Sequence, residues 1–365
     1  MTDHLIELDL TRSLVEDPRD GHNRWHPGIA PIRTVASGDT ITADLRDGLD
    51  YQIWPHSGID DAVALDITRG HPMTGPFFVE GAEPGDVLDV HIREVKAYDF
   101  GFTMFLPGVG MLADRFAEPF LVKWHLEDGL ATSPDMPGIA VPGDPFLGVI
   151  GVAPSPERVA AFTKREADLA ATGAFVLPPE PMNAVTHDPE LDAVAIRTVP
   201  PRENGGNMDV RRMYAGTHVL LPVEVPGALL SVGDAHFAQG DGESCGVAIE
   251  TTARTVLDIT LLKAADLPGR AGVPTYRYTE RAPREFFATT GYPITKAGEN
   301  LDMDVYAAAA MALDELVDHL VRERGLTASQ AYVLVSVAAD LHVSSIVNIP
   351  NPCVSAALPT DLFVS

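Results

Sequence analysis

The chain has 365 residues, of which 45% are apolar and 21% charged, and this composition is typical of a globular protein with a large core. The 52 acidic residues outnumber the 26 basic ones and give a formal net charge of −26, which argues against nucleic acid or an anionic membrane as a partner. Two cysteines, no signal-peptide pattern and no apolar stretch of membrane-spanning length together predict a cytoplasmic protein.

Alternating apolar and polar residues predict strands in the first hundred residues, at 41–46 and 88–93. Gly-Asp pairs at 38–39 and 85–86 precede these strands, and a third pair at 233–234 is interpreted as a turn of the same kind. Phe77 to Glu80 is predicted as a short strand that ends in a carboxylate. The Gly- and Pro-rich stretch 99–155 is predicted to be mostly loop with brief strands.

The second half of the chain contains a predicted helix from Pro156 to about Ala171, with Ser155 as its N-cap. Strands are predicted at 218–225, 228–232, 247–251 and 255–262, and irregular structure at 266–300. Helices are predicted at 302–324 and from a capping box at Thr327 to about Ala339. We therefore expect a mainly β protein with a sandwich or barrel-like catalytic body over 1–265 and a small α+β segment over 266–365 packed on it.

The segment Gly233–Gly246 contains the densest set of chemically capable side chains in the chain. Asp234 and His236 are two residues apart, so both point to one side of an extended strand and can share a metal ion. Asp241 and Glu243 repeat this spacing, and Cys245 continues it. The alternative is a glycine-rich hairpin whose acids are solvated.

Three further features are candidates for the same site. Asn207 and Asp209, after a Gly-Gly pair, can supply an amide and a carboxylate to a small polar substrate, although an ordinary turn has the same composition. Glu250, at the end of the next strand, faces either the site or the solvent. The histidines lack the spacing of a metal motif, and His56 and His71 stand out only because turns and acids surround them. Nucleotide-binding motifs are missing from the sequence, so no organic cofactor is expected.

Several motifs of the chain resemble those of the acetamidase/formamidase family. The stretches 71–76 and 79–88 resemble the N-terminal signature of that family, 205–209 its middle motif, and 221–250 its longest signature, all in the family's order. The resemblance implies a β-sandwich or barrel-like core and hydrolysis of a short linear amide to a carboxylate and ammonia. Phe237 departs from the small residue that the family often has, so the substrate pocket is expected to differ.

Amide hydrolysis needs an activated nucleophile, an acid for the departing nitrogen and donors for the oxyanion. We predict that water is activated either by a divalent metal, zinc or calcium, or by a carboxylate, and that the ligands of the metal are Asp234, His236 and Asp241. The predicted catalytic residues are Glu80, Asp209, Glu243 and Cys245, and the predicted substrate-binding residues are Asn207, Phe237 and Gln239. Two alternatives stay open: Cys245 as an acyl-accepting nucleophile, and a non-catalytic sandwich that binds a small amide or sugar. Self-association into a homo-oligomer is also expected.

Overall fold

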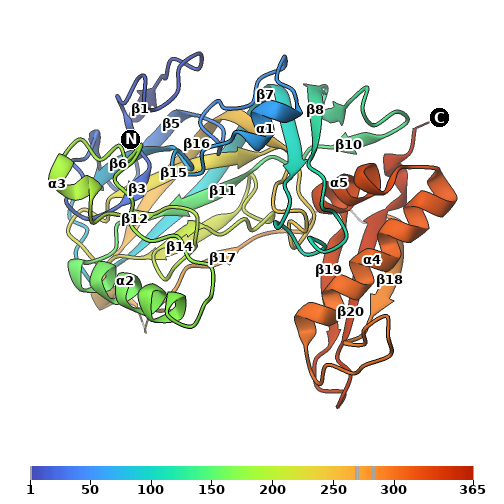
Figure 1. Ribbon diagram of the computed structural model, residues 1–365. Helices are drawn as coiled ribbons and strands as arrows, with labels where there is room; N and C mark the ends of the chain where they lie inside the picture. Colours follow the sequence, from blue (N-terminus) through green and yellow to red (C-terminus); the bar gives the residue numbers. More distant parts are fainter. Residues whose placement is uncertain (1, 268, 270, 281–283, 365) are drawn as a thin grey trace.

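The computed structural model describes residues 2–267, 269, 271–280 and 284–364, and sheets dominate it (Figure 1). The main path of the largest sheet has the order β10–β9–β8–β7–β16–β15–β11–β13. In that order, the strands are Ala140–Pro142, Leu130–Thr132, Phe120–Glu127, Val87–Phe105, Glu250–Leu262, Leu230–His236, Phe146–Gly151 and Gly205–Asn207.

Seven further strands branch from this path. β5 (Thr40–Leu45) pairs with β16, β6 (Met73–Val79) pairs with β15, and β14 (His218–Pro222) pairs with β7. The outer strands are β1 (Asp3–Ile6), β2 (Gly21–His22), β4 (Arg33–Val35) and β17 (Thr275–Arg277). β3 (Arg24–Trp25) and β12 (Ile196–Arg197) form a separate two-stranded sheet.

One aliphatic core joins two parts of the large sheet. Its buried side chains come from β5, β7, β14 and β16 and also from β6, β11 and β15, so the sheet folds over on itself and encloses them. Period-2 burial along β16, where Ala253, Leu257 and Ile259 are buried, is the pattern that predicted this strand. The mainly β fold predicted from the sequence is thereby confirmed.

The predicted loop at 99–155 is wrong for much of its length. β7 continues to Phe105, and β8 to β11 follow within that stretch. β7 is stabilised by β16 on one edge and by β8 on the other, where Phe100 to Phe105 pair with Phe120 to His125. This pairing outweighs the local preference of glycine and proline for turns.

Five helices are described. α1 (Ile59–Val63) and α3 (Pro189–Asp192) are short, and α2 (Pro156–Ala170) is capped by the Ser155 hydroxyl as predicted. α4 (Val305–Arg324) ends at Gly325, and α5 (Ala328–Ala338) begins with the predicted capping box at Thr327. Two 3-10 turns, η1 (Ala264–Asp266) and η2 (Thr360–Leu362), complete the helical elements of the described residues. None of these helices has the length and apolar composition that crossing a membrane requires.

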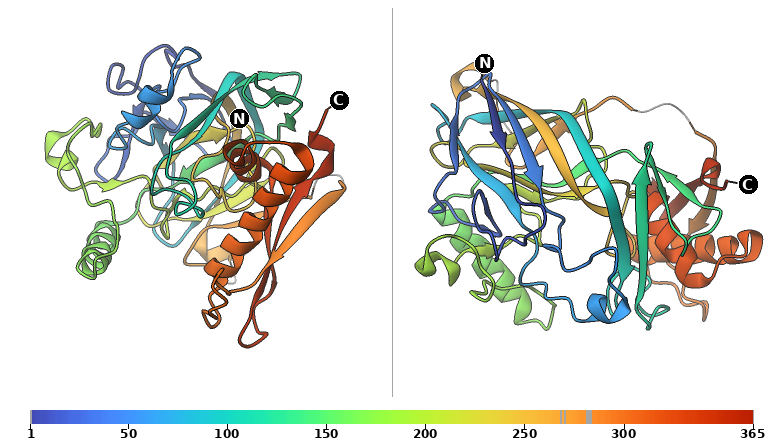
Figure 2. Two further views of the ribbon diagram at one scale, coloured as in Figure 1. Left: turned by 45° about the vertical axis from the view of Figure 1, so that its right-hand side comes forward. Right: turned by 90° about the horizontal axis from the view of Figure 1, so that it is seen from above.

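The C-terminal part contains a sheet that the sequence pattern did not predict. β18 (Phe286–Gly291), β20 (Cys353–Pro359) and β19 (Asp340–Ser345) form three antiparallel strands, and α4 packs on them (Figures 1 and 2). Buried side chains of α4 and α5 share a core with Phe105 and Trp124 of the large sheet. The segment 266–365 is therefore joined to the β body by a continuous apolar contact.

The strands that carry the candidate site meet at one edge. β15 pairs with β11 through His236 and Phe146, and with β16 through His236 and Glu250. The predicted turn at Gly233-Asp234 is wrong, because both residues lie inside β15. The strands predicted at 247–251 and 255–262 form one continuous strand, β16, which begins at Glu250.

Candidate active site

A cavity of about 440 Å³ lies where β15 ends and β16 begins. Its polar lining comes from residue 71, from 207–209 and from the stretch 234–250. These residues are His71, Asn207, Asp209, Asp234, His236, Glu243 and Glu250. Asp234, His236 and Glu250 are each at most 5% exposed, so their charges interact with little screening by solvent.

His236 is held by hydrogen bonds that determine which ring nitrogen carries a proton. The Gln239 Nε2 donates to the backbone carbonyl of Asp209 at 2.8 Å, so the Gln239 Oε1 faces His236 Nδ1, at 2.9 Å. His236 must therefore donate from Nδ1, and its Nε2 faces two carboxylates, Glu250 at 3.2 Å and Asp234 at 3.5 Å. Although burial opposes it, the charges of Glu250 and Asp234 raise the pKa of His236 well above its usual value.

The four acids of the cavity have different proton affinities. Burial raises the pKa of Glu243 to about 8 and that of Glu250 to about 7. Burial, and after it the negative charge of the neighbouring Glu243, also raise the pKa of Asp209. Burial also disfavours charge on Asp234, but His71 and His236 outweigh it and lower the Asp234 pKa.

Three of these acids have strained backbone. Asp209, Asp234 and Glu243 take left-handed conformations, with φ of 47°, 53° and 43°. Such conformations cost about 1 kcal/mol or more for a residue other than glycine and occur preferentially at functional sites. All three of these residues line the same cavity.

Two glycines make room for the Asp234 carboxylate. A Cβ atom on Gly48 would lie 1.9 Å from Asp234 Oδ1. A Cβ on Gly148 would lie 2.8 Å from Asp234 Oδ2 and 2.7 Å from Asp209 Oδ1. All three distances are too short for a side chain, so the backbones of Gly48 and Gly148 form the walls around the carboxylates.

Two groups of ligand atoms in the cavity are close enough to hold a metal ion. Asp209, Asp234 and His236 form one group, and His236, Glu243 and Glu250 form the other, with the ligand atoms of each group within 4.8 Å of one another. Two of the predicted metal ligands, Asp234 and His236, are therefore in suitable positions. Asp209 Oδ1 and Glu250 Oε2 are buried without a hydrogen-bond partner among the described residues, as expected for atoms that bind an ion or a substrate.

The structure places three predicted site residues elsewhere. Glu80 follows β6 and is exposed, and Asp241 is ion-paired with Arg212; neither lines the cavity. Phe237 is 5% exposed and packs in the core, with its ring against Gly143. These positions give no support to a catalytic Glu80, a metal-ligating Asp241 or a substrate-binding Phe237.

His71 and Glu250 line the cavity although the sequence did not predict them as site residues. Gly48 and Gly148, which lie against the carboxylates, were not predicted either. His71 is the first residue of the motif at 71–76, and turns and acids surround it in the sequence. In the structure its Nδ1 is buried at the cavity without a partner among the described groups, and burial lowers the His71 pKa. Asn207 lines the cavity as predicted; its Nδ2 donates to the Val199 carbonyl, and its Oδ1 is left without a described partner.

Cys245 lines the cavity but is poorly suited to act as a nucleophile. Its thiol hydrogen-bonds the backbone carbonyls of Met104 and Val247 at 3.4 and 3.5 Å. Burial raises the pKa of the Cys245 thiol to about 12, so the reactive thiolate is scarce at neutral pH.

We expect the Cys245→Ala variant to keep the kcat of the parent enzyme for formamide within about twofold, because the thiol takes no part in the reaction. Its free energy of unfolding should fall by about 1 kcal/mol, since a small buried group is lost. Ammonia release and urea unfolding measure the two effects. A folded variant with a hundredfold lower kcat would instead support Cys245 as the nucleophile.

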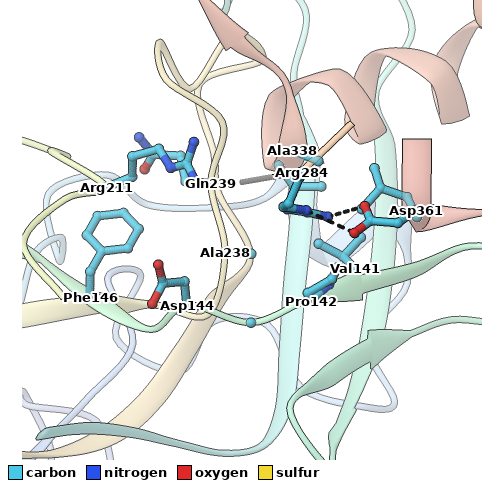
Figure 3. A pocket seen from close by; sticks show the side chains of 13 residues that line it. Val141, Pro142, Asp144, Phe146, Arg211, Ala238, Gln239, Arg284, Ala338 and Asp361 are labelled. Atoms are coloured by element: carbon cyan, nitrogen blue, oxygen red, sulfur yellow. Dashed lines mark hydrogen bonds and ion pairs between the residues drawn. The ribbon is translucent and has the colours of Figure 1, made fainter. Parts of the chain in front are cut away.

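Gln239 separates His236 from a second cavity. This cavity, of about 350 Å³, is lined by Gln239, Phe146 and Arg211 among others (Figure 3). Its two arginines are neutralised, Arg211 by Asp340 and Arg284 by Asp361. The predicted substrate-binding role of Gln239 is therefore less apt than a positioning role, since its amide contacts His236 and the Asp209 backbone.

Replacing Gln239 with Leu should lower kcat/KM for formamide by about 10- to 100-fold, because His236 loses the acceptor that fixes its tautomer. Gln239→Glu keeps an oxygen at that place and should recover part of the loss. Steady-state ammonia release measures both variants. Equal activities of the Leu and Glu variants would contradict the positioning role.

Known proteins resemble the chain over nearly its whole length. The model of the Acetamidase/Formamidase family matches residues 7–365. The formamidase of Methylophilus methylotrophus is 33% identical and the alignment covers 98% of this chain and 93% of that protein. The acetamidase of Mycolicibacterium smegmatis is 31% identical, with 92% and 89% covered.

Solved structures agree with these relatives. A gamma lactamase from Delftia acidovorans superposes with a TM-score of 0.94 at 31% identity, covering 99% of this chain and 93% of its own. An acetamidase from Bacillus halodurans gives a TM-score of 0.56 at 27% identity, with 94% and 96% covered. Fold, site and relatives together define a hydrolase that acts on the C–N bond of short linear amides. The chain belongs to the Acetamidase/Formamidase family.

Proposed function

We propose that the amide is cleaved in the cavity around His236 by attack of a water molecule, with carboxylate and ammonia as products. The observation that carries this proposal is the orientation of His236, whose Nδ1 is occupied by Gln239 while Nε2 faces Asp234 and Glu250. A histidine that donates one ring N–H to a fixed acceptor while its other nitrogen faces carboxylates is a common arrangement of metal-binding sites, and a bound ion would replace the proton on that second nitrogen.

The donor set fits a divalent metal held by Asp209, Asp234 and His236. An imidazole nitrogen with two carboxylates suits zinc, whereas calcium takes six or more oxygen ligands, so of the two metals we propose zinc. Such an ion lowers the pKa of bound water and polarises a carbonyl group. Asp209 here takes the place of Asp241 in the predicted ligand set.

Glu243 is the group that moves the proton. Its carboxylate lies within 4.8 Å of ligand atoms of His236 and Glu250 and lines the cavity. In its ionised form it accepts a proton from the attacking water, and the water oxygen bonds to the carbonyl carbon. As the C–N bond breaks, Glu243 donates this proton to the departing nitrogen, so that ammonia leaves.

The remaining polar atoms match the amide group of the substrate. Asn207 Oδ1 has no described partner and can accept an N–H of the amide, because Nδ2 is fixed on the Val199 carbonyl. The His71 Nδ1–H can donate to the carbonyl oxygen, on which negative charge develops. Asn207 therefore binds the nitrogen of the substrate amide, and His71 binds its oxygen.

Metal analysis of the purified protein tests this assignment. We expect about one zinc per chain, loss of at least nine-tenths of the activity on chelation, and recovery when zinc is added back. Full formamide hydrolysis by metal-free protein would remove the metal from the mechanism and leave Glu243 as a carboxylate base acting alone.

A lactam is a second candidate substrate, favoured by the similarity to the gamma lactamase over nearly the full length of both chains. Ring opening of a γ-lactam breaks the same type of bond and needs the same groups. Product detection with a γ-lactam under the conditions used for formamide decides whether the chain has this activity.

We further propose that the protein acts as a cytoplasmic homo-oligomer and binds no nucleic acid. The net charge of −26 supports the second part. Apolar side chains exposed on the C-terminal hairpin, Val343, Ile346, Val347 and Ile349, support self-association. Sedimentation of the purified protein measures its oligomeric state.

A further inference from the structure

The cavity is much larger than formamide or acetamide requires. Its volume of about 440 Å³ falls in the range of sites that hold ligands of drug size, which is about 300–1,000 Å³. Formamide and acetamide have only a few non-hydrogen atoms, and each such atom occupies roughly the space of one water molecule, about 30 Å³ or less. Most of the cavity therefore stays unfilled when either amide is bound.

Much of the remaining lining of the cavity is apolar. Leu49, Leu65, Met104, Leu106 and Val247 line it and belong to a single hydrophobic cluster. Leu49 and Met104 are nearly fully buried, so this wall is part of the packed interior and is present before substrate binds. We name these five residues the acyl wall.

Further apolar lining of the cavity comes from loops. Ile67 follows α1, Leu177 follows α2, and Val199 precedes β13. Among the described lining residues none is a lysine or an arginine, and the acids are those grouped around His236. A charged group on the acyl side of a substrate would meet no partner here, and an anionic one would be repelled by the acids.

We propose that the enzyme also cleaves primary amides whose acyl group is a large, uncharged, apolar chain or ring. The amide group binds at Asn207 and His71, and the acyl group lies against the acyl wall. This inference rests on the proposed function, because it places the scissile bond at the same polar end. It extends the substrate class from formamide and acetamide to medium-chain and aryl-alkyl amides.

Ammonia release from a series of primary amides tests the proposal. We expect kcat/KM to rise roughly threefold for each methylene from acetamide to hexanamide, which is about the gain from burying one methylene, and to be high for phenylacetamide. A kcat/KM that falls with acyl length, while formamide and acetamide are still cleaved, would overturn the inference and leave the proposed function intact. No ammonia from any amide would overturn the proposed function itself.

A variant locates the effect in the cavity. Leu177→Trp fills space in the cavity and should lower the ratio of kcat/KM for hexanamide to that for formamide at least tenfold. The matched control is Val194→Trp, at a half-exposed position outside the cavity, which should leave this ratio unchanged. An unchanged ratio in folded Leu177→Trp would place the acyl group elsewhere and refute the proposal.

Discussion

Replacing His236 with Asn should lower kcat for formamide on the order of 1,000-fold. His236 belongs to both groups of metal-ligand atoms, with Asp209 and Asp234 and with Glu243 and Glu250. The shorter asparagine cannot reach both carboxylates while it also contacts Gln239. The variant should therefore lose the metal and the electrostatic balance of the site together.

The same change leaves buried acids without their cation. Asp234 and Glu250 are at most 5% exposed, and His236 is the charged partner of both. An uncompensated buried carboxylate is costly, so one of these acids takes up a proton instead. We expect a lower free energy of unfolding as well, and circular dichroism with urea unfolding must show that the variant is folded at the assay temperature.

A matched control separates this effect from a general loss of histidine. His125 lies on β8 with its side chain exposed, and His125→Asn should keep the parent kcat and metal content. Elemental analysis of the three proteins gives the zinc per chain. If folded His236→Asn turned over formamide within tenfold of the parent, the site around β15 would not be the place of cleavage.

Residues two apart point to the same side where the chain is an extended strand, but not where it turns. Asp234 and His236 were predicted to share a side, and both contribute to the cavity because β15 continues through them. Asp241 and Glu243 have the same spacing, but only Glu243 lines the cavity. A Cβ on Gly240 would lie 2.1 Å from the Ala339 carbonyl oxygen, so the chain passes tightly against the end of α5 and turns there.

The sequence next to the residues that complete the site gives little indication that they belong to it. Gly48, His71 and Glu250 reach the cavity from segments that only the sheet topology brings together. The left-handed backbone of Asp209 and Glu243 cannot be read from an Asn-Gly or Gly-Asp pattern, because acids in turns usually take ordinary conformations. The small C-terminal sheet escaped prediction for a similar reason, since β18 has five of its six residues half-buried or exposed.

The Gly48→Ala substitution tests whether the position of the Asp234 carboxylate matters. The new methyl group would lie 1.9 Å from Asp234 Oδ1 and 3.1 Å from Glu250 Oε2, so the Asp234 side chain has to move. A displacement of about 1 Å in a catalytic group costs on the order of 100-fold in rate. We therefore expect kcat for formamide to fall at least 100-fold, together with a lower zinc content.

The loss should come from the site and not from unfolding. Inserting one methyl group into a packed interior costs about 1–3 kcal/mol, which a protein of this size tolerates. Gly272→Ala is the control, because no atom lies within 4 Å of a Cβ at that position. Gly148→Ala should act like Gly48→Ala, since its methyl would lie 2.7–2.8 Å from the Asp209 and Asp234 carboxylates. Folded Gly48→Ala with parent activity would show that Asp234 can shift freely, and an ion bound rigidly by Asp234 could then have no part in catalysis.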